Sequence, residues 1–186
     1  SGERVVFCWR GGMRSKAAAT VVDLMGIPIY RLEGGIRTYR HWVVETLETF
    51  DMQPVTYALN GFTGSGKTII LNRLAKEGYP VIDLEGLAGH RGSIFGQIGK
   101  EPNNQRIFDS LLLQDLLKYQ HSPYILVEAE SRRIGKVLLP DFLLNKKAEG
   151  IQIYIDMPID ERVRNILDDY QPWNYHEEFI HAFKLI

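Results

Sequence analysis

The sequence has little of several features that define common protein classes. Its single cysteine, Cys8, excludes a disulfide framework and a cysteine-rich zinc site, and it favours a reducing, cytoplasmic setting. The apolar runs are far shorter than the roughly 20 residues of a membrane-spanning helix, and the start of the chain lacks the basic and apolar stretches of a signal peptide. The formal net charge of −1 gives no overall positive field, so binding to nucleic acid would require local basic patches.

Composition and the order of apolar segments indicate a globular α/β protein. Hydrophobic residues make up 45% of the 186 residues and charged residues 24%, as in ordinary folded domains. Short apolar segments of strand type alternate with helical segments, which predicts parallel sheets covered by helices. We predict two blocks, residues 1–53 and 54–186, with a linker at 51–54.

Each block is expected to follow a strand–helix order. In the first, we expect strands at 5–7 and 29–32 and helices at 16–25 and 36–50, with Ser15 capping the first helix. In the second, we expect strands at 56–60, 81–84, 124–128 and 151–155, and helices at 67–76, 105–118, 142–147 and 160–170. The glycine-rich segment 86–100 is expected to be a mobile loop.

The second block carries a phosphate-binding sequence between its first strand and its first helix. Residues 61–68 read Gly-Phe-Thr-Gly-Ser-Gly-Lys-Thr and match G-x-x-x-x-G-K-[ST], the P-loop. Glycines let backbone N–H groups converge on phosphate oxygens, and the helix N-terminus adds positive potential. The predicted phosphate-binding residues are Gly61, Thr63, Gly64, Ser65, Gly66, Lys67 and Thr68.

Acidic residues at the ends of neighbouring strands could complete this site. Glu128 ends the strongest apolar strand and is our first candidate to hold the water shell of Mg²⁺ together with Thr68. The alternative is that Glu128 or Glu130 only ends a strand or pairs with a nearby arginine. Asp83 begins a D-x-x-G pattern and could also face the phosphates, but no N-K-x-D follows, so a GTPase is disfavoured. We predict no dedicated metal site and no tightly bound cofactor.

The only cysteine lies in a loop that favours the thiolate. Cys8 ends the first strand, a helix follows, and Arg10 and Arg14 are close in sequence. Positive charge and a helix N-terminus both stabilise the thiolate, which is the nucleophilic form. The alternative is a buried structural cysteine, which is the usual fate of a lone one.

Two motifs resemble known families. Cys8 to Ser15 resembles the active-site loop of rhodaneses, C-x-x-G-x-R-S, with one extra residue before the arginine, and residues 32–35 resemble the Gly-Gly turn that follows. A rhodanese half joined to a P-loop half is similar to the tRNA 2-selenouridine synthase family. The stretches that carry this second resemblance are residues 7–15, 61–68, 87–93 and 130–135.

The resemblance implies a fold and a reaction. The chain would hold the C-terminal half of a rhodanese-like domain followed by a P-loop domain, truncated at both ends, so the activity of the fragment alone stays open. The family replaces the sulfur of wobble 2-thiouridine in tRNA by selenium from selenophosphate, through S-geranyl-2-thiouridine made from geranyl diphosphate. Cys8 would carry or deliver the selenium, and Arg10, Arg14 and the loop amides would bind selenophosphate. The P-loop would hold the diphosphate, with or without Mg²⁺, and no membrane is implied.

Further residues are candidates for substrate contacts. A loop that could face the substrate carries His90, Arg91 and Ser93, and Ile94, Phe95 and Ile98 could line an isoprenoid groove. Basic residues that could meet tRNA phosphates are Arg132, Arg133 and Lys136, then Lys146 and Lys147. The alternatives are local packing for the apolar residues and solvated surfaces for the basic ones.

Two other functions remain open on the sequence. A small P-loop kinase would use ATP at Lys67 but would leave the Cys8 loop without a role. A non-catalytic nucleotide- or RNA-binding module would need neither Cys8 nor turnover.

Overall fold

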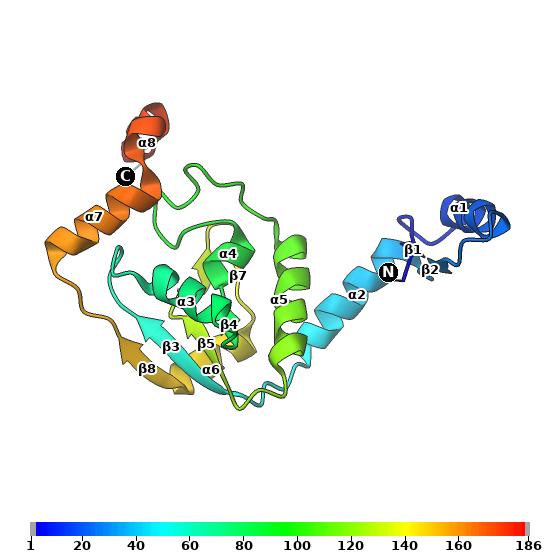
Figure 1. Ribbon diagram of the computed structural model, residues 1–186, viewed down its shortest axis with the longest axis horizontal. Helices are drawn as coiled ribbons and strands as arrows, with labels where there is room; N and C mark the ends of the chain where they lie inside the picture. The colour runs from blue at the N-terminus through cyan, green and yellow to red at the C-terminus, as the bar shows by residue number, and fades with distance from the viewer. Residues whose placement is uncertain (1–2, 185–186) are drawn as a thin grey trace. The chain divides into compact units, whose positions relative to one another are not determined.

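The computed structural model describes residues 3–184 and divides the chain into two compact units, residues 1–49 and 50–186 (Figure 1). The predicted boundary lay between residues 53 and 54. Met52, in the predicted linker, is only 2% exposed, and the backbone N–H of Val55 donates to the carbonyl of Pro123. The segment 50–54 therefore belongs to the second unit. Residues 1, 2, 185 and 186 lie outside the described part.

The first unit is a small strand–helix–strand–helix arrangement. Its elements are β1 (Val5–Val6), α1 (Met13–Leu24), β2 (Tyr30–Arg31) and α2 (Gly35–Glu48). β1 and β2 pair in parallel, so the loop after β1 lies beside the turn after β2. A Cβ atom added at Gly35 would lie 2.0 Å from the carbonyl oxygen of Cys8, so only glycine permits this close approach.

The second unit is built on a parallel sheet, as the sequence predicted. Its strands are β4 (Val81–Ile82), β5 (Tyr124–Glu128), β3 (Val55–Asn60) and β8 (Ile151–Tyr154), paired in that order and all parallel. The register sets Leu59 opposite Glu128 and Ile153. The carboxyl ends of the central strands β3 and β5 therefore meet at one edge, where α/β proteins place their ligands.

Helices bury the apolar side chains of this sheet. α3 (Lys67–Lys76) contacts β4 and β5, and α6 (Asp141–Glu149) contacts β3. α5 (Gln105–Tyr119) packs beside β4 (Figure 1). Four of its apolar side chains are buried. Leu59, Leu71 and Val81 form the core between α3 and the sheet.

Several short elements were not predicted. They are α4 (Leu84–Ala88), the antiparallel pair β6 (Arg133–Ile134) and β7 (Val137–Leu138), the 3₁₀ turn η1 (Pro172–Asn174) and α8 (His176–Phe183). α4 occupies the start of the expected glycine-rich loop. These elements are too short for apolar periodicity to reveal them. The longer α7 (Ile159–Tyr170) was predicted to within one residue. Within residues 3–184, every helix is too short or too polar to cross a lipid bilayer.

The packing of α5 predicts a large difference between two adjacent substitutions. Phe108 is fully buried and Ile107 is 45% exposed. Phe108→Ala is expected to lower the free energy of unfolding of the second unit by about 3–5 kcal/mol, because it leaves a cavity in the core. Ile107→Ala is expected to stay within about 1 kcal/mol of wild type. Denaturant titration followed by circular dichroism measures both, and equal losses would contradict this packing.

Candidate functional site

The P-loop forms a tight turn between β3 and α3. Gly64 and Gly66 both adopt positive φ angles, 79° and 83°. A Cβ atom at Gly64 would lie 2.5 Å from the carbonyl oxygen of Arg162 and 2.8 Å from Ile166, both on α7. Asn165 of α7 donates to the Gly64 carbonyl at 2.8 Å. The loop is therefore held by a helix that lies about a hundred residues later in the chain.

Two polar groups of the loop have the chemistry of a phosphate site. Lys67 Nζ folds back and donates to the carbonyl of Gly61 at 2.8 Å, so its charge lies at the loop. Ser65 is 1% exposed, and its hydroxyl has no hydrogen-bond partner within the described residues. Buried polar atoms are rarely left unpaired in native proteins. The unpaired hydroxyl beside the start of α3 is consistent with a ligand that supplies oxygen atoms.

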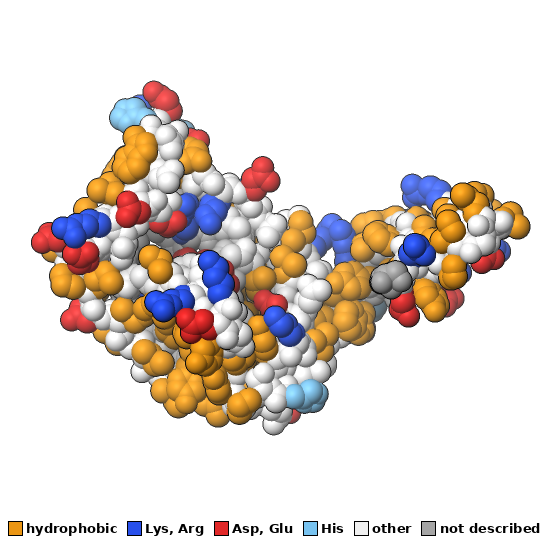
Figure 2. Space-filling model, viewed as in Figure 1, with side chains coloured by type: hydrophobic (Ala, Val, Ile, Leu, Met, Phe, Trp, Pro, Cys, Tyr) orange, Lys and Arg blue, Asp and Glu red, His pale blue; other side chains and the backbone are white. Residues whose placement is uncertain are grey.

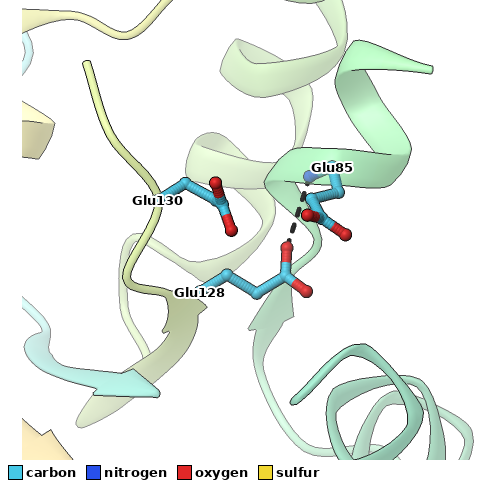
Figure 3. A group of neighbouring side chains, drawn as sticks. All are labelled: Glu85, Glu128 and Glu130. Atoms are coloured by element: carbon cyan, nitrogen blue, oxygen red, sulfur yellow. Dashed lines mark hydrogen bonds between the residues drawn. The ribbon is translucent and has the colours of Figure 1, made fainter. Parts of the chain in front are cut away.

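Three glutamates lie next to the start of α3. Thr68 Oγ1 donates to Glu128 Oε1 at 2.7 Å and lies 3.2 Å from Glu85 Oε2. Glu85, Glu128 and Glu130 offer carboxylate oxygens that all lie within 4.8 Å of one another, and the backbone N–H of Glu85 points to Glu128 (Figure 3). Glu85 is a residue that the sequence reasoning missed.

Burial and mutual repulsion disfavour the charged form of the glutamates in this cluster. Burial raises the pKa of Glu128 to about 8, and the charge of Glu85 adds to the effect. Burial likewise raises the pKa of Glu85. Thr68 and Glu128 supply the hard oxygen donors that Mg²⁺ prefers, and a dication would relieve the repulsion. The residues present therefore fit Mg²⁺ beside the P-loop.

The P-loop opens into a cleft of about 600 Å³, and Figure 2 shows a hollow in this unit with basic and acidic side chains around it. The far wall is the loop that carries Arg91 and Ser93. Arg91 Nε pairs with Asp169 of α7 at 2.7 Å, and its Nη1 donates to the carbonyl of Ile98. The hydroxyls of Ser93 and Tyr170 lie 2.5 Å apart. These contacts fix the loop to the end of α7.

Several predicted site residues have other contacts. Asp83 lines the cleft, but its carboxylate accepts from the backbone N–H of Gly86 and so caps α4. Ile98 is 3% exposed, and the ring of Phe95 packs against Phe179 of α8 at 5.4 Å between centroids. The alternative, local packing, is therefore confirmed for the buried Ile98, whereas a groove lined by Phe95 and by Ile94, which is 69% exposed, stays a prediction.

The predicted basic clusters divide in the same way. Lys147 was expected to meet RNA, but it is 6% exposed, and its Nζ donates to the carbonyl of Glu130. That expectation is wrong, because the charge lies beneath the acid cluster and burial lowers the pKa of this lysine. Arg132, Arg133 and Lys136 are exposed, and Arg132 pairs with Asp141 at 3.0 Å. They remain predicted RNA contacts.

In the first unit, Cys8 lies in a loop that stabilises its thiolate. Ser15 Oγ lies 3.2 Å from Cys8 Sγ, and hydrogen bonds from Ser15 lower the pKa of the thiol from 9.0 to about 7. Backbone N–H groups of the loop add to this effect. Cys8, Arg10 and Arg14 together line a cavity of about 390 Å³. The predicted helix cap at Ser15 is wrong: α1 begins at Met13, and the Ser15 hydroxyl faces the sulfur instead.

Comparisons with known proteins point to one family. Residues 55–184 match the family model described as the tRNA 2-selenouridine synthase AAA domain. Proteins named tRNA 2-selenouridine synthase are 35% identical in Nitrosomonas europaea, 38% in Bdellovibrio bacteriovorus and 33% in a Sulfurovum species. The matches cover 89%, 90% and 97% of this chain, but 44%, 45% and 50% of those relatives. The chain thus spans about half the length of the curated relatives it matches.

The Cys8 loop predicts a pH-dependent reaction with iodoacetamide. Cys8 is the only cysteine, so labelling reports on it alone. The alkylation rate is expected to rise with a midpoint near pH 7. Ser15→Ala removes the hydrogen bond to the thiolate, and a rise of one pKa unit would slow alkylation at pH 7 roughly fivefold. Thr20→Ala, an exposed hydroxyl on the same helix, serves as the control, and an equal effect of both variants would contradict the assignment.

The buried carboxylate predicts a pH-dependent stability difference in the presence of a chelator. The pKa of Glu128 is raised on folding, so its contribution to stability is fully present below pH 4.5 and is lost as the pH rises through about 8. Glu128→Gln keeps an acceptor for Thr68 without the charge. Its stability relative to wild type should therefore increase over this range in thermal unfolding. A difference that does not change with pH, or one matched by exposed Glu149→Gln, would argue against this.

Proposed function

The chain belongs to the tRNA 2-selenouridine synthase family, and we propose that it supplies the phosphate-binding and sulfur-bearing parts of an enzyme that modifies transfer RNA in the cytoplasm. Because it spans about half of its relatives, we take it as part of a longer protein. Its first unit would then be the C-terminal half of a rhodanese-like domain. The enzyme would replace the sulfur of wobble 2-thiouridine by selenium from selenophosphate, through an S-geranylated nucleoside made from geranyl diphosphate.

The observation that carries this proposal is the P-loop with its Thr68–Glu128 hydrogen bond at the edge of the sheet. Such a site suits the diphosphate of geranyl diphosphate as a leaving group, because loop N–H groups and Lys67 neutralise the charge that develops as the bond to carbon breaks. Mg²⁺, held by Thr68 and Glu128 when bound, would supply further charge stabilisation. Hydrolysis of a nucleotide is not needed for this role.

The Cys8 loop would carry out the second step. A thiol whose pKa is about 7 is substantially ionised at neutral pH, so it would be a nucleophile beside the bound selenophosphate while selenium forms its bond to the thiocarbonyl carbon of the S-geranylated nucleoside and geranyl thiolate leaves. Arg10 and Arg14, which line the same cavity, would bind the selenophosphate anion. The exposed residues Arg132, Arg133 and Lys136 would contact tRNA phosphates.

A second candidate is an ATP-dependent kinase. The Thr68–Glu128 pair favours a kinase as well, because this arrangement suits Mg²⁺ bound to a nucleoside triphosphate. The kinase would leave Cys8 and its lowered pKa without a role. Phosphoryl transfer from ATP to a small molecule would support the kinase.

The deciding experiment offers the full-length protein thiolated tRNA, geranyl diphosphate and selenophosphate, and measures the nucleosides by mass spectrometry after digestion. Lys67→Ala is expected to slow geranylation by at least ~100-fold, because it removes a charge from the leaving-group site. Cys8→Ser is expected to abolish selenation while tRNA binding is retained. Lys76→Ala, an exposed lysine of the same helix, is the control.

Two outcomes would contradict the proposal. If wild-type protein leaves thiolated tRNA unchanged but consumes ATP, the site is that of a kinase. If tRNA binds and neither cosubstrate is turned over, the chain belongs to a binding module.

A further inference from the structure

His90 lies in a narrow slot between two backbone segments. A Cβ atom added at Gly96 would lie 2.5 Å from His90 Cε1, and one added at Gly135 would lie 2.5 Å from His90 Cδ2. Both distances are far shorter than van der Waals contact, so a side chain at either glycine would displace the ring. Gly135 is in the turn between β6 and β7, whereas His90 follows α4. Glycine at positions 96 and 135 thus leaves the space that the imidazole ring of His90 occupies.

The imidazole keeps hydrogen-bonding capacity that the fold does not use. His90 Nδ1 is buried, and it has no hydrogen-bond partner within residues 3–184. A histidine that serves packing alone normally pairs its buried nitrogen. His90 also lines the cleft that contains the P-loop. Because Nδ1 lies on the buried side of this fixed ring, Nε2 is the nitrogen that could accept a proton from a substrate bound beside the phosphate site.

The charges around His90 favour its neutral form without removing its basicity. Burial lowers the pKa of His90, and the charge of Arg91 on the same loop lowers it further. The backbone of Arg91 and, more weakly, the carboxylate of Glu130, which follows β5, act in the opposite direction, raise the pKa of His90 and favour the imidazolium. The ring is therefore neutral at neutral pH, and Glu130 can stabilise the proton that it accepts.

Several other titratable groups that line this cleft are engaged within the protein. Asp83 caps α4, and Asp169 pairs with Arg91. The hydroxyl of Tyr170 bonds to Ser93, and the carboxylate of Glu85 is next to Thr68 and accepts from Gly92. The carboxylates of Glu130 and Asp168 also line the cleft, but a carboxylate is ordinarily a weaker base than an imidazole, so His90 is the better acceptor for a proton lost by a substrate.

We propose that His90 is the general base of prenyl transfer, a role that rests on the proposed function. The thiocarbonyl sulfur of the nucleoside forms a bond to C1 of the geranyl group. The bond between C1 and the diphosphate oxygen breaks, and its electron pair leaves with the diphosphate in the P-loop. The proton on the ring nitrogen next to the thiocarbonyl carbon moves to the neutral imidazole of His90. Charge and atoms balance without an oxidant or a further reactant.

The test measures geranylation of thiolated tRNA by the full-length protein as a function of pH. His90→Gln and His90→Ala are expected to lower the rate by ~100-fold or more while binding of geranyl diphosphate is retained, because general-base catalysis contributes about 10²–10⁴-fold. Imidazole in the buffer is expected to restore part of the His90→Ala rate by entering the emptied slot, an effect that a structural role would not give. His121→Gln, an exposed histidine, is the matched control.

The pH profile provides a readout that leaves His90 in place. Wild-type rate should fall on the acid side with an apparent pKa below 6.5, the ordinary value for histidine. Glu130→Gln removes the charge that favours the imidazolium, so it should move this acid limb to lower pH. The limb should be absent in His90→Gln.

The outcomes separate the two proposals. If wild-type protein binds tRNA but never alkylates it, the proposed function fails. If wild-type protein alkylates tRNA and His90→Gln does so at the same rate and with the same acid limb, the function stands and the role of His90 is overturned. Loss of His90→Ala activity without imidazole rescue, together with an acid limb that Glu130→Gln does not move, would also overturn it.

Discussion

A hydrogen bond of 2.7 Å between the Thr68 hydroxyl and the buried carboxylate of Glu128 joins the start of α3 to the end of β5. The rest of the site depends on this contact. The parallel register sets Leu59 of β3 opposite Glu128, so the P-loop leaves the sheet beside the carboxylate. α7 fixes the other side of the loop through Asn165. These two contacts restrict the conformation of the loop, which would reduce the entropy lost if a phosphate group binds there.

The same contact imposes a cost on stability. Glu128 is fully buried next to Glu85 and Glu130, and such clusters are unfavourable when all members are charged. Lys147 offsets little of this, because its Nζ bonds to the backbone carbonyl of Glu130 rather than to a carboxylate. A cation together with a diphosphate would relieve the repulsion. Repulsion among these carboxylates would thus favour the binding of a cation at this position, a common compromise between stability and function.

Sequence reasoning predicted the parts of the fold that local patterns encode. The P-loop motif, its place between strand and helix, and Glu128 at a strand end all follow from short-range signals, and the parallel sheet follows from their order. Glu85 was missed because it reaches Thr68 only through α4, a helix of five residues that contains a glycine. The inward-facing Lys147 was missed because lysines are usually exposed. Its position four residues after the buried Leu143 on α6 was the available signal. Ser15 was predicted to cap a helix. Its contact with Cys8 was missed because that contact depends on how the loop folds.

The proposed function requires that the P-loop bind a diphosphate, and the dependence of pyrophosphate binding on Mg²⁺ tests this directly. Inorganic pyrophosphate would be titrated calorimetrically into wild-type protein and into Thr68→Val, with and without Mg²⁺. The account predicts that Mg²⁺ strengthens wild-type binding by about tenfold or more, because hard oxygen donors coordinate it there, and that Thr68→Val loses this gain while retaining the Mg²⁺-free affinity. An equal gain from Mg²⁺ in both proteins, or no binding by wild type, would contradict it.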